Sequence, residues 1–244
     1  MRLQLFLARA GICSRRKALE FIKQGRVSVD RQKILEPSCQ VVPSKNIVFF
    51  DGRKISLKNN TYLLFNKPKG ITTTRSDPFA AKTLSDILPR QYAHLHPVGR
   101  LDRDTKGLLL LTNDGELTFR ITHPKFKVEK TYKALLDKPL NKNDLLRIAR
   151  GLILEDGLTL PCKVRIESKF KVEVTLREGR KRQVRRMFES LGYRVLELKR
   201  VREGCLSLGS LPEGKFRQLT KEEVRSLYRE AGLGADLKAV NRSY

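Results

Sequence analysis

The chain has 244 residues, of which 51 are Lys or Arg and 26 are Asp or Glu, so its net charge is +25 at pH 7. A hydrophobic content of 40% is enough for an ordinary core and excludes a disordered basic tail. No apolar run approaches about 18 residues, which excludes a membrane-spanning helix, and the large positive excess indicates a polyanionic partner such as a nucleic acid.

The four cysteines are scattered and form no Cys-x-x-Cys pair. We therefore expect neither a zinc ribbon nor a redox motif, but reduced thiols in a cytoplasmic protein. Amphipathic periodicity begins by Leu3, so no signal-peptide pattern is expected at the N-terminus.

Two short helices are predicted at the start of the chain. The first has an apolar stripe at Leu3, Phe6, Leu7 and Ala10. Gly11 is expected to end it. Ser14 is a candidate N-cap for a second helix that runs to about Gln24, with Gly25 as its stop.

Short strands and positive charge follow these helices. The stretch "RVSVD" alternates like a strand, and "IVFFDGRKI" predicts a hairpin that turns at Asp51 and Gly52. Residues 1–58 hold 13 basic and four acidic side chains, a net charge of +9. Arg15, Arg16 and Lys17, at the start of the second helix, are expected to contact RNA phosphates. The alternative is a helical hairpin that only decorates the surface.

The rest of the chain predicts one larger domain after a linker near Asn59 and Asn60. Strands are predicted in "TYLLFNK", "GLLLLT", "EKTYKALL", "KVEVTL", "VLELKRV" and "FRQL". Asp114 is expected to cap a short helix. Further helices are predicted from the apolar positions Leu145, Ile148 and Ala149; Val184, Met187, Phe188 and Leu191; and Val224, Leu227 and Tyr228. Thr220 and Glu223 have the spacing of a capping box for the last of them.

The sequence lacks the motifs typical of nucleotide-cofactor and metal sites. No Gly-rich phosphate-binding loop is present, so a nucleotide cofactor is not expected. His94 and His96 would share one face of a strand, as a metal pair requires, but no Cys or acidic cluster lies near them in the sequence. A structural or surface role is therefore favoured over a metal site.

The stretch "HPVGRLDRDTKGLLLLTNDGEL" contains the pattern Gly-Arg-Leu-Asp-x-x-Thr-x-Gly-Leu-Leu at residues 99–109. With it the chain resembles the pseudouridine synthases of the RsuA and RluB group. The stretches "NKPKG", "EKTYKA" and "EGRKRQVRRMF" agree with further motifs of that group. The segment "RLQLFLARAGICSRRKALEFIKQGRVSVD" resembles an S-four-type RNA-binding domain, and it departs from that family at "VDRQ", where Asn-Gly is usual.

The resemblance implies an α+β architecture in two domains. Residues 1–58 would form the S-four-type RNA-binding domain. Residues 61–231 would form the catalytic domain, a mixed and mainly antiparallel β-sheet with flanking helices, and residues 232–244 a flexible tail. The implied activity is isomerisation of a uridine in ribosomal RNA to pseudouridine, by base flipping and without a cofactor. The implied partner is ribosomal RNA or a pre-ribosomal particle, bound by a monomer.

By this resemblance Asp102 is the catalytic carboxylate, close to the sugar and the base. Flanking arginines would favour its charged form. Tyr132 falls on the family's tyrosine, which would stack on the uracil and remove the carbon-5 proton. Arg185 falls on the arginine that pairs with the acid.

Four more residues are assigned to RNA contacts. Arg100 would fill the gap that the flipped uridine leaves, beside Leu101. Arg182 and Arg186 would contact phosphates, within a stretch, residues 177–202, that holds ten basic and three acidic side chains.

Two other functions remain open from the residues alone. One is a non-catalytic ribosome-assembly factor. The other is a magnesium-dependent nuclease using Asp102 and Asp104, which the basic residue between them disfavours. Among targets, the large ribosomal subunit is preferred and the small subunit is the alternative.

Overall fold

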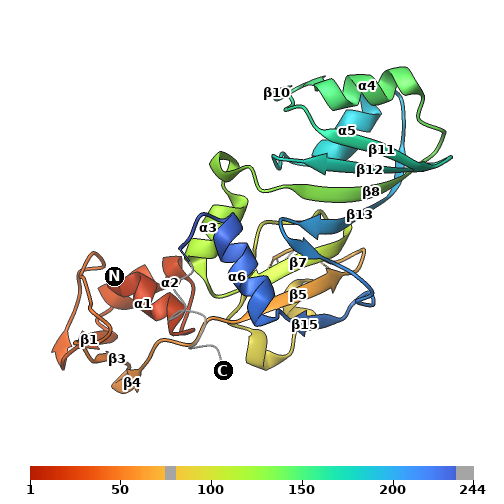
Figure 1. Ribbon diagram of the computed structural model, residues 1–244. Helices are drawn as coiled ribbons and strands as arrows, with labels where there is room; N and C mark the ends of the chain where they lie inside the picture. The colour runs from red at the N-terminus through yellow and green to blue at the C-terminus, as the bar shows by residue number, and fades with distance from the viewer. Residues whose placement is uncertain (75–80, 235–244) are drawn as a thin grey trace. The chain divides into compact units, whose positions relative to one another are not determined.

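The computed structural model describes residues 1–74 and 81–234, and it divides into two compact units (Figure 1). The first unit comprises residues 1–60 and the second begins at Thr61. Each unit has its own hydrophobic core. The predicted tail lies outside the described residues from position 235 onward.

The first unit packs two helices against a small antiparallel sheet with the strand order β2-β1-β3-β4. Its elements are α1 (Leu3–Arg9), α2 (Arg15–Lys23), β1 (Val27–Val29), β2 (Gln32–Lys33), β3 (Val48–Phe50) and β4 (Arg53–Ile55). The predicted helix pair and the hairpin at Asp51 and Gly52 are confirmed. The Ser14 hydroxyl accepts a hydrogen bond from the Lys17 N–H, as expected of an N-cap.

The β1–β2 turn forms without the usual Asn-Gly pair. Val29 pairs with Gln32 across a two-residue loop in which Asp30 and Arg31 have φ values of 50° and 69°. Both residues thus occupy the left-handed region that a tight hairpin turn requires. The Asp30 carboxylate also accepts hydrogen bonds from the Ile47 N–H and the Asn46 side chain, each at 2.7 Å. These two hydrogen bonds stabilise a turn that the sequence alone predicts only weakly.

The second unit is built on one mixed sheet with the strand order β11-β12-β8-β13-β7-β5-β15. Strand β14 pairs with β13, and β6 pairs with β7. Its strands are β5 (Tyr62–Lys67), β6 (His96–Pro97), β7 (Lys106–Thr112), β8 (Lys130–Leu136), β11 (Lys163–Ser168), β12 (Lys171–Leu176), β13 (Val195–Glu203), β14 (Leu206–Ser207) and β15 (Phe216–Gln218). Among these pairs only β13 and β7 run parallel, so the predicted α+β, mainly antiparallel architecture is confirmed.

Helices and short turns complete this unit. The α-helices are α3 (Gly115–Thr122), α4 (Lys142–Arg150), α5 (Gln183–Glu189) and α6 (Lys221–Glu230). Three 3₁₀ turns, η1 (Leu84–Asp86), η2 (Arg90–Tyr92) and η3 (Pro124–Phe126), and a hairpin of β9 (Ile153–Leu154) and β10 (Gly157–Leu158) lie in the connections. The predicted capping box of Thr220 and Glu223 is present at α6.

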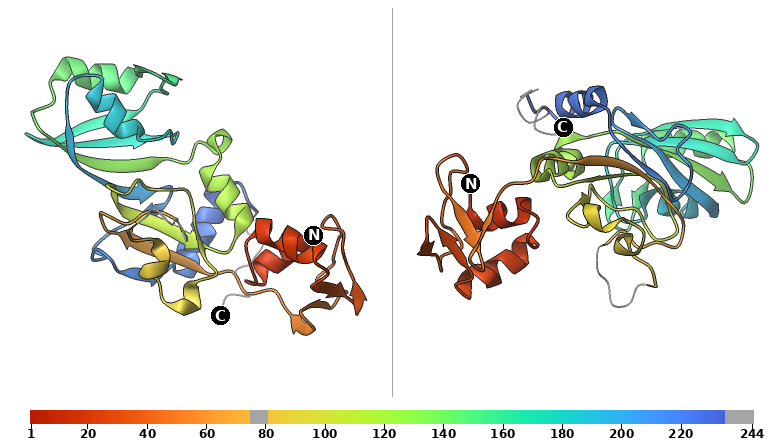
Figure 2. Two further views of the ribbon diagram at one scale, coloured as in Figure 1. Left: turned by 180° about the vertical axis from the view of Figure 1, so that it is seen from behind. Right: turned by 90° about the horizontal axis from the view of Figure 1, so that it is seen from below.

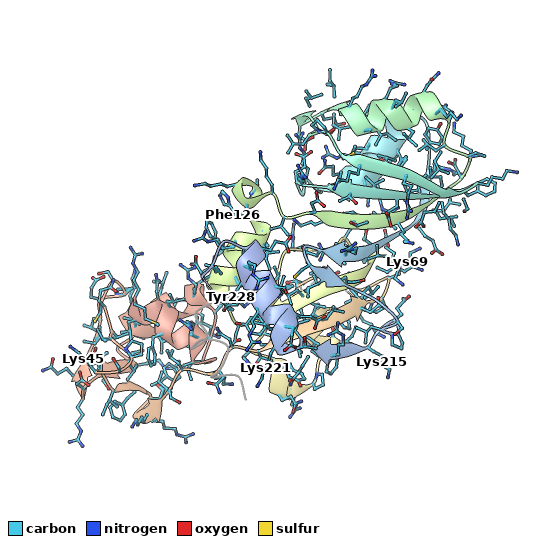
Figure 3. All side chains as sticks on the ribbon, in the orientation of Figure 1. Lys45, Lys69, Phe126, Lys215, Lys221 and Tyr228 are labelled. Carbon is cyan, nitrogen blue, oxygen red and sulfur yellow. The ribbon has the colours of Figure 1, made fainter. Side chains whose placement is uncertain are left out.

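Strands β5 and β7 separate two apolar layers. Leu64 and Leu108 face a core that includes residues of α3 and α6, whereas Leu63 and Leu109 face a second core. The Asp114 carboxylate caps α3 and accepts a hydrogen bond from the hydroxyl of Tyr62 (3.0 Å) and one from that of Tyr228. Tyr228 lies on α6 (Figure 3), so this buried network connects α3, β5 and α6.

Helices α4 and α5 lie together against the part of the sheet that carries β11 and β12 (Figures 1 and 2). Their core contains Ile148 from α4, Phe188 from α5 and Val174 from β12. The ring of Tyr132 on β8 packs against this core and also against the second core beside β5 and β7. Tyr132 therefore lies where the two halves of the sheet meet.

The sequence-based boundaries were wrong at one helix. Leu191 was expected on the face of α5, but the helix ends at Glu189, and the chain turns through Gly192 to bring Tyr193 into the core. The β9–β10 hairpin was also not predicted, because two residues per strand carry no readable alternation.

Candidate active site

The backbone of the loop that carries Asp102 is held on both sides. The Leu101 N–H donates to the Thr73 hydroxyl (3.2 Å), and that hydroxyl donates to the Leu101 carbonyl (2.5 Å). The Thr105 N–H donates to the Asp102 carbonyl at 3.0 Å, which closes the turn. The main chain around Asp102 is thus fixed by hydrogen bonds that do not involve its carboxylate.

The buried side chain of Lys67 donates a hydrogen bond to the same loop. The Arg103 carbonyl accepts hydrogen bonds from the Gly70 N–H (2.8 Å) and the Lys67 ammonium (3.4 Å). The Lys67 side chain is 0% exposed, and burial lowers its pKa to about 8. The negative charges of Asp102 and Asp104 oppose that shift.

Asp102 lies in the wall of a pocket of about 330 Å³. The pocket is lined by residues 99–102 and Thr105, by Thr122, by Lys130 and Tyr132 of β8, by residues 176 and 178–184, and by Leu198 and Arg200 of β13. Among the residues that the structure describes, none donates a hydrogen bond to the half-buried Asp102 carboxylate. The buried hydroxyl of Thr105, also in the wall, makes no hydrogen bond within these residues. Both groups are therefore available to a bound molecule.

Tyr132 and Arg200 are direct cross-strand partners on β8 and β13 and line the same pocket. Burial raises the pKa of the Tyr132 hydroxyl, and the negative charges of Glu203 and Asp102 act in the same direction. The positive charge of Arg200 acts in the opposite direction.

Arg200 is itself buried and held. Its Nε donates to the Leu108 carbonyl at 2.8 Å, and its Nη2 lies 3.2 Å from the Glu203 carboxylate. The two side chains are 2% and 1% exposed. Lys130, the cross-strand partner of Glu203, has a pKa that burial lowers, and the Glu203 charge opposes that effect.

Arg185 approaches the acid's loop without forming an ion pair to the acid. Its guanidinium donates to the Asp104 carbonyl (3.2 Å) and to the Val195 carbonyl (2.8 Å), and the side chain is 7% exposed. Burial lowers the pKa of Arg185, while the charges of Asp104 and Asp102 oppose that effect. Arg185 thus lies next to the loop that carries Asp102, where its hydrogen bonds connect α5 with β13 and with residue 104.

The candidate RNA-contact residues differ in their surroundings. Arg100 is exposed, Leu101 is only 4% exposed, and Arg182 is exposed, and all three line the pocket. Arg186, however, forms a two-pronged ion pair with Asp156 at 2.8 and 2.9 Å, which ties α5 to the β9–β10 hairpin. This pairing makes Arg186 less available to a phosphate than Arg182.

In the first unit Arg15, Arg16 and Lys17 are exposed at the start of α2. The ammonium of Lys17 lies 5.5 Å from the centre of the Phe21 ring, and the guanidinium of Arg26 lies 4.3 Å from it. This helix therefore presents a positive surface suited to a phosphate backbone.

No group of three or more His, Cys, Asp or Glu side chains within residues 1–74 and 81–234 could hold a metal ion. Nε2 of His96 lies 3.0 Å from the Thr118 hydroxyl, in keeping with the structural role expected for it. In the same ranges no helix is long and apolar enough to cross a bilayer.

Sequence reasoning missed Lys67, Lys130, Arg200 and Glu203 as members of the site. Alternation along "VLELKRV" could have placed Arg200 on the same face as Leu198. It could not have placed Glu203 there, because a bulge between Arg200 and Arg202 shifts the register.

Comparison with known proteins agrees with this arrangement. Residues 61–190 match the family described as RNA pseudouridylate synthase, and residues 1–47 match the S4 domain. Ribosomal large subunit pseudouridine synthase B of Bacillus subtilis (strain 168) is 40% identical over 232 residues, which cover 93% of this chain and 95% of that protein. Ribosomal small subunit pseudouridine synthase A of Vibrio cholerae is 38% identical over 239 residues, covering 94% and 100%. A crystal structure described as pseudouridylate synthase covers 93% of this chain and 99% of its own, with 34% identity and a TM-score of 0.69.

The fold, the pocket and these matches define an RNA-modifying isomerase with an N-terminal RNA-binding domain. The chain belongs to the RNA pseudouridylate synthase family.

Proposed function

We propose that this protein converts one specific uridine of ribosomal RNA to pseudouridine, with Asp102 as the catalytic carboxylate. The observation that carries the proposal is the position of Asp102. Its backbone is fixed at Leu101, Arg103 and Thr105, while its carboxylate, in a pocket shared with Tyr132, accepts no hydrogen bond from the residues that the structure describes. A carboxylate held in this way is preorganised to meet a flipped nucleotide.

The chemistry suits this set of side chains. Isomerisation breaks the carbon–nitrogen bond between uracil and ribose and forms a carbon–carbon bond between the same two rings. No electrons and no atoms are gained, so we expect no redox or group-transfer cofactor. Asp102 would supply a nucleophile or a base beside the sugar and the base. Tyr132 would stack on the uracil and accept the carbon-5 proton at its oxygen.

Arg185 would serve the acid indirectly. Its bond to the Asp104 carbonyl holds the chain two residues beyond Asp102. Arg100, exposed at the mouth of the pocket, would enter the base stack when the uridine leaves it, and Arg182 would contact the backbone nearby.

The first unit would bind the RNA through its phosphate backbone. We assign residues 1–58 to RNA binding, residues 61–231 to catalysis, and residues 232–244 to a flexible tail. Arg15, Arg16 and Lys17 would make phosphate contacts that position the RNA without reading its sequence. The enzyme would act as a monomer in the cytoplasm, where ribosomes are assembled.

For the target we prefer the large subunit, as in the name of the Bacillus relative. The small subunit, as in the name of the Vibrio relative, is the alternative. The two relatives are 40% and 38% identical to this chain, so similarity alone does not separate the targets.

The test is incubation of the protein with 16S and 23S rRNA transcripts in EDTA, followed by mapping of pseudouridine. A synthase forms pseudouridine in one transcript despite the chelator. A magnesium-dependent nuclease would cleave only when the metal is restored, and an assembly factor would bind without either reaction. The Asp102→Asn protein is the control, and equal pseudouridine formation by it would refute the assignment of the acid.

A further inference from the structure

The buried pair of Arg200 and Glu203 has no role in the function proposed above. Both residues lie on β13, and Arg200 lines the pocket that holds Asp102 and Tyr132. We propose that Arg200 is a positioning residue that orients the Tyr132 hydroxyl for the reaction, and that Glu203 holds Arg200 in place. The inference rests on the proposed role of Tyr132.

Sheet geometry brings the three residues together. Arg200 and Tyr132 are directly opposed on antiparallel strands, so their side chains leave the same face of the sheet. Residues three apart on a regular strand would face opposite sides. The bulge between Arg200 and Arg202 adds one residue, and Glu203 therefore returns to the face of Arg200.

The guanidinium of Arg200 is held by one hydrogen bond and one ion pair. Nε donates to the Leu108 carbonyl on β7, the strand that leaves the Asp102 loop. Nη2 faces the Glu203 carboxylate but makes no hydrogen bond of good geometry within the described residues. Arg200 thus connects the strand that follows the catalytic acid with the strand that carries the tyrosine.

Stability does not explain this pair. Desolvating two charges costs about as much as their attraction returns, and apolar residues of similar size are often as stable. Neither carboxylate oxygen of Glu203 has a hydrogen-bond partner in the described part of the chain. Because its contribution to stability does not account for the pair, we assign Glu203 the role of keeping the Arg200 side chain beside the pocket by charge attraction.

The expected effect on Tyr132 has a defined sign. Arg200 lowers the pKa of the Tyr132 hydroxyl by its positive charge, and Glu203 raises it by its negative charge. The other charged groups that line the pocket are Arg100, Asp102, Lys130, Glu178, Arg180, Lys181 and Arg182. Tyr132 must first lose its hydroxyl proton to solvent. The carbon-5 proton then passes to the phenolate oxygen, while the electron pair of the broken carbon–hydrogen bond stays in the base and restores its conjugation. A tyrosine that is harder to ionise would perform this step more slowly.

The test compares Glu203→Gln, Arg200→Lys and the double variant Arg200→Met with Glu203→Leu. The double variant removes the pair without leaving a buried charge, so it remains informative if a single variant fails to fold. Arg217→Lys is the matched control, because Arg217 forms an Arg–Glu pair with Glu223 that lies outside the pocket lining.

Two readouts are measured across pH. Single-turnover pseudouridine formation at saturating enzyme reports the chemistry. NMR of protein labelled at tyrosine Cζ, with the Tyr132 signal assigned by its absence in Tyr132→Phe, reports on the hydroxyl without any reaction.

We expect the double variant to react about 10- to 100-fold more slowly, with unchanged RNA affinity and a Tyr132 signal that titrates at higher pH. Glu203→Gln should move that titration to lower pH, Arg200→Lys should lie between wild type and the double variant, and Arg217→Lys should change neither readout. A folded double variant with wild-type rate and an unmoved Tyr132 signal would overturn the inference. If the wild type forms no pseudouridine in any rRNA while the Tyr132 signal shifts as expected, the proposed function fails and the contact between Arg200 and Tyr132 stands.

Discussion

A Cβ atom placed on Gly107 would lie 2.2 Å from the carbonyl oxygen of Arg200. The two residues are paired on the parallel strands β7 and β13, and Gly107 has a φ of 110°. No side chain fits between these backbones, so the glycine five residues after Asp102 allows the two halves of the sheet to join.

The first prediction follows from this contact. Gly107→Ala should lower the free energy of unfolding by about 3 kcal/mol, the sum of a left-handed backbone penalty and overpacking. Urea unfolding measures the change. Gly157→Ala is the matched control, since its φ is 99° but nothing lies within 4 Å of its added Cβ. Equal losses at the two sites would show that the approach to Arg200 is not the cause.

The second prediction concerns the acid. Asp102→Asn should reduce pseudouridine formation by at least about 1,000-fold, because an amide is neither a nucleophile nor a base here. RNA affinity should stay within about threefold, since binding depends on many phosphate contacts. Quantitative mass spectrometry of the RNA measures the product. Asp104→Asn, a nearby acid paired with Arg103 at 3.8 Å, should keep most of the activity, and the reverse ranking of the two variants would show that the wrong aspartate was chosen.

The third prediction separates three arginines of one segment. Arg185→Met should slow single-turnover chemistry by about 10- to 100-fold, because the loop loses its bond at Asp104. Arg185→Lys should be intermediate, since lysine keeps a donor but not the planar fork.

Its two neighbours provide the comparison. Arg182→Met should mainly weaken RNA binding, and Arg186→Met should mainly loosen the hairpin at Asp156. Binding isotherms and single-turnover rates distinguish these effects. A fully active Arg185→Met protein beside an inactive Arg182→Met protein would move the positioning role to Arg182.

The fourth prediction concerns Lys67 and pH. The pKa of Lys67 is lowered from 10.5 to about 8 by burial, so between pH 8 and 10.5 the unfolded chain binds more protons at this residue than the folded one. The contribution of Lys67 to stability should therefore rise with pH across that window, by about 3 kcal/mol in total. Below pH 8 the cost of burying the charged form is present in full.

Urea unfolding of wild type and Lys67→Met at pH 7, 9 and 10 measures this contribution. The difference between them should move in favour of wild type as the pH rises. A difference that stays constant from pH 7 to 10 would contradict the burial of a charged amine at this position.

The fifth prediction concerns the first unit. Removal of residues 1–60 takes away the net +9 of residues 1–58 and should weaken rRNA binding and flatten its dependence on salt. Replacing Arg15, Arg16 and Lys17 by Gln should reduce the slope of log affinity against log salt by about 2, at about 0.7–0.9 per phosphate contact. Unchanged binding by both proteins would exclude α2 from the RNA interface.

Much of the local structure could be predicted from short stretches of sequence. The Ser14 cap, the Thr220 capping box and the hairpin at Asp51 depend on neighbours in sequence, and all three are confirmed. The end of α5 was not readable, because the helix stops where Tyr193 finds its place in the core, and that core is built from distant strands.

The candidate site divides in the same way. The motif around Asp102, the tyrosine of "EKTYKA" and the arginine helix could be named from the sequence, although their roles remain predictions. The partners of Lys67 and Arg200 could not be named, because they come from other parts of the chain. They are the Arg103 carbonyl at Lys67, and Leu108 and Tyr132 at Arg200.

The sequence by itself determined the two-part architecture and the family, and it named Asp102 as the candidate acid, since charge, periodicity and one specific motif are local properties. Only the tertiary structure decided which charges are buried together. Strand register and the bulge at residues 200–202 place Arg200 between Tyr132 and Glu203. The close approach at Gly107 brings β13 against β7, the strand that follows the Asp102 loop. Such pairings depend on hydrogen bonding between strands far apart in the chain, which no single stretch of sequence specifies.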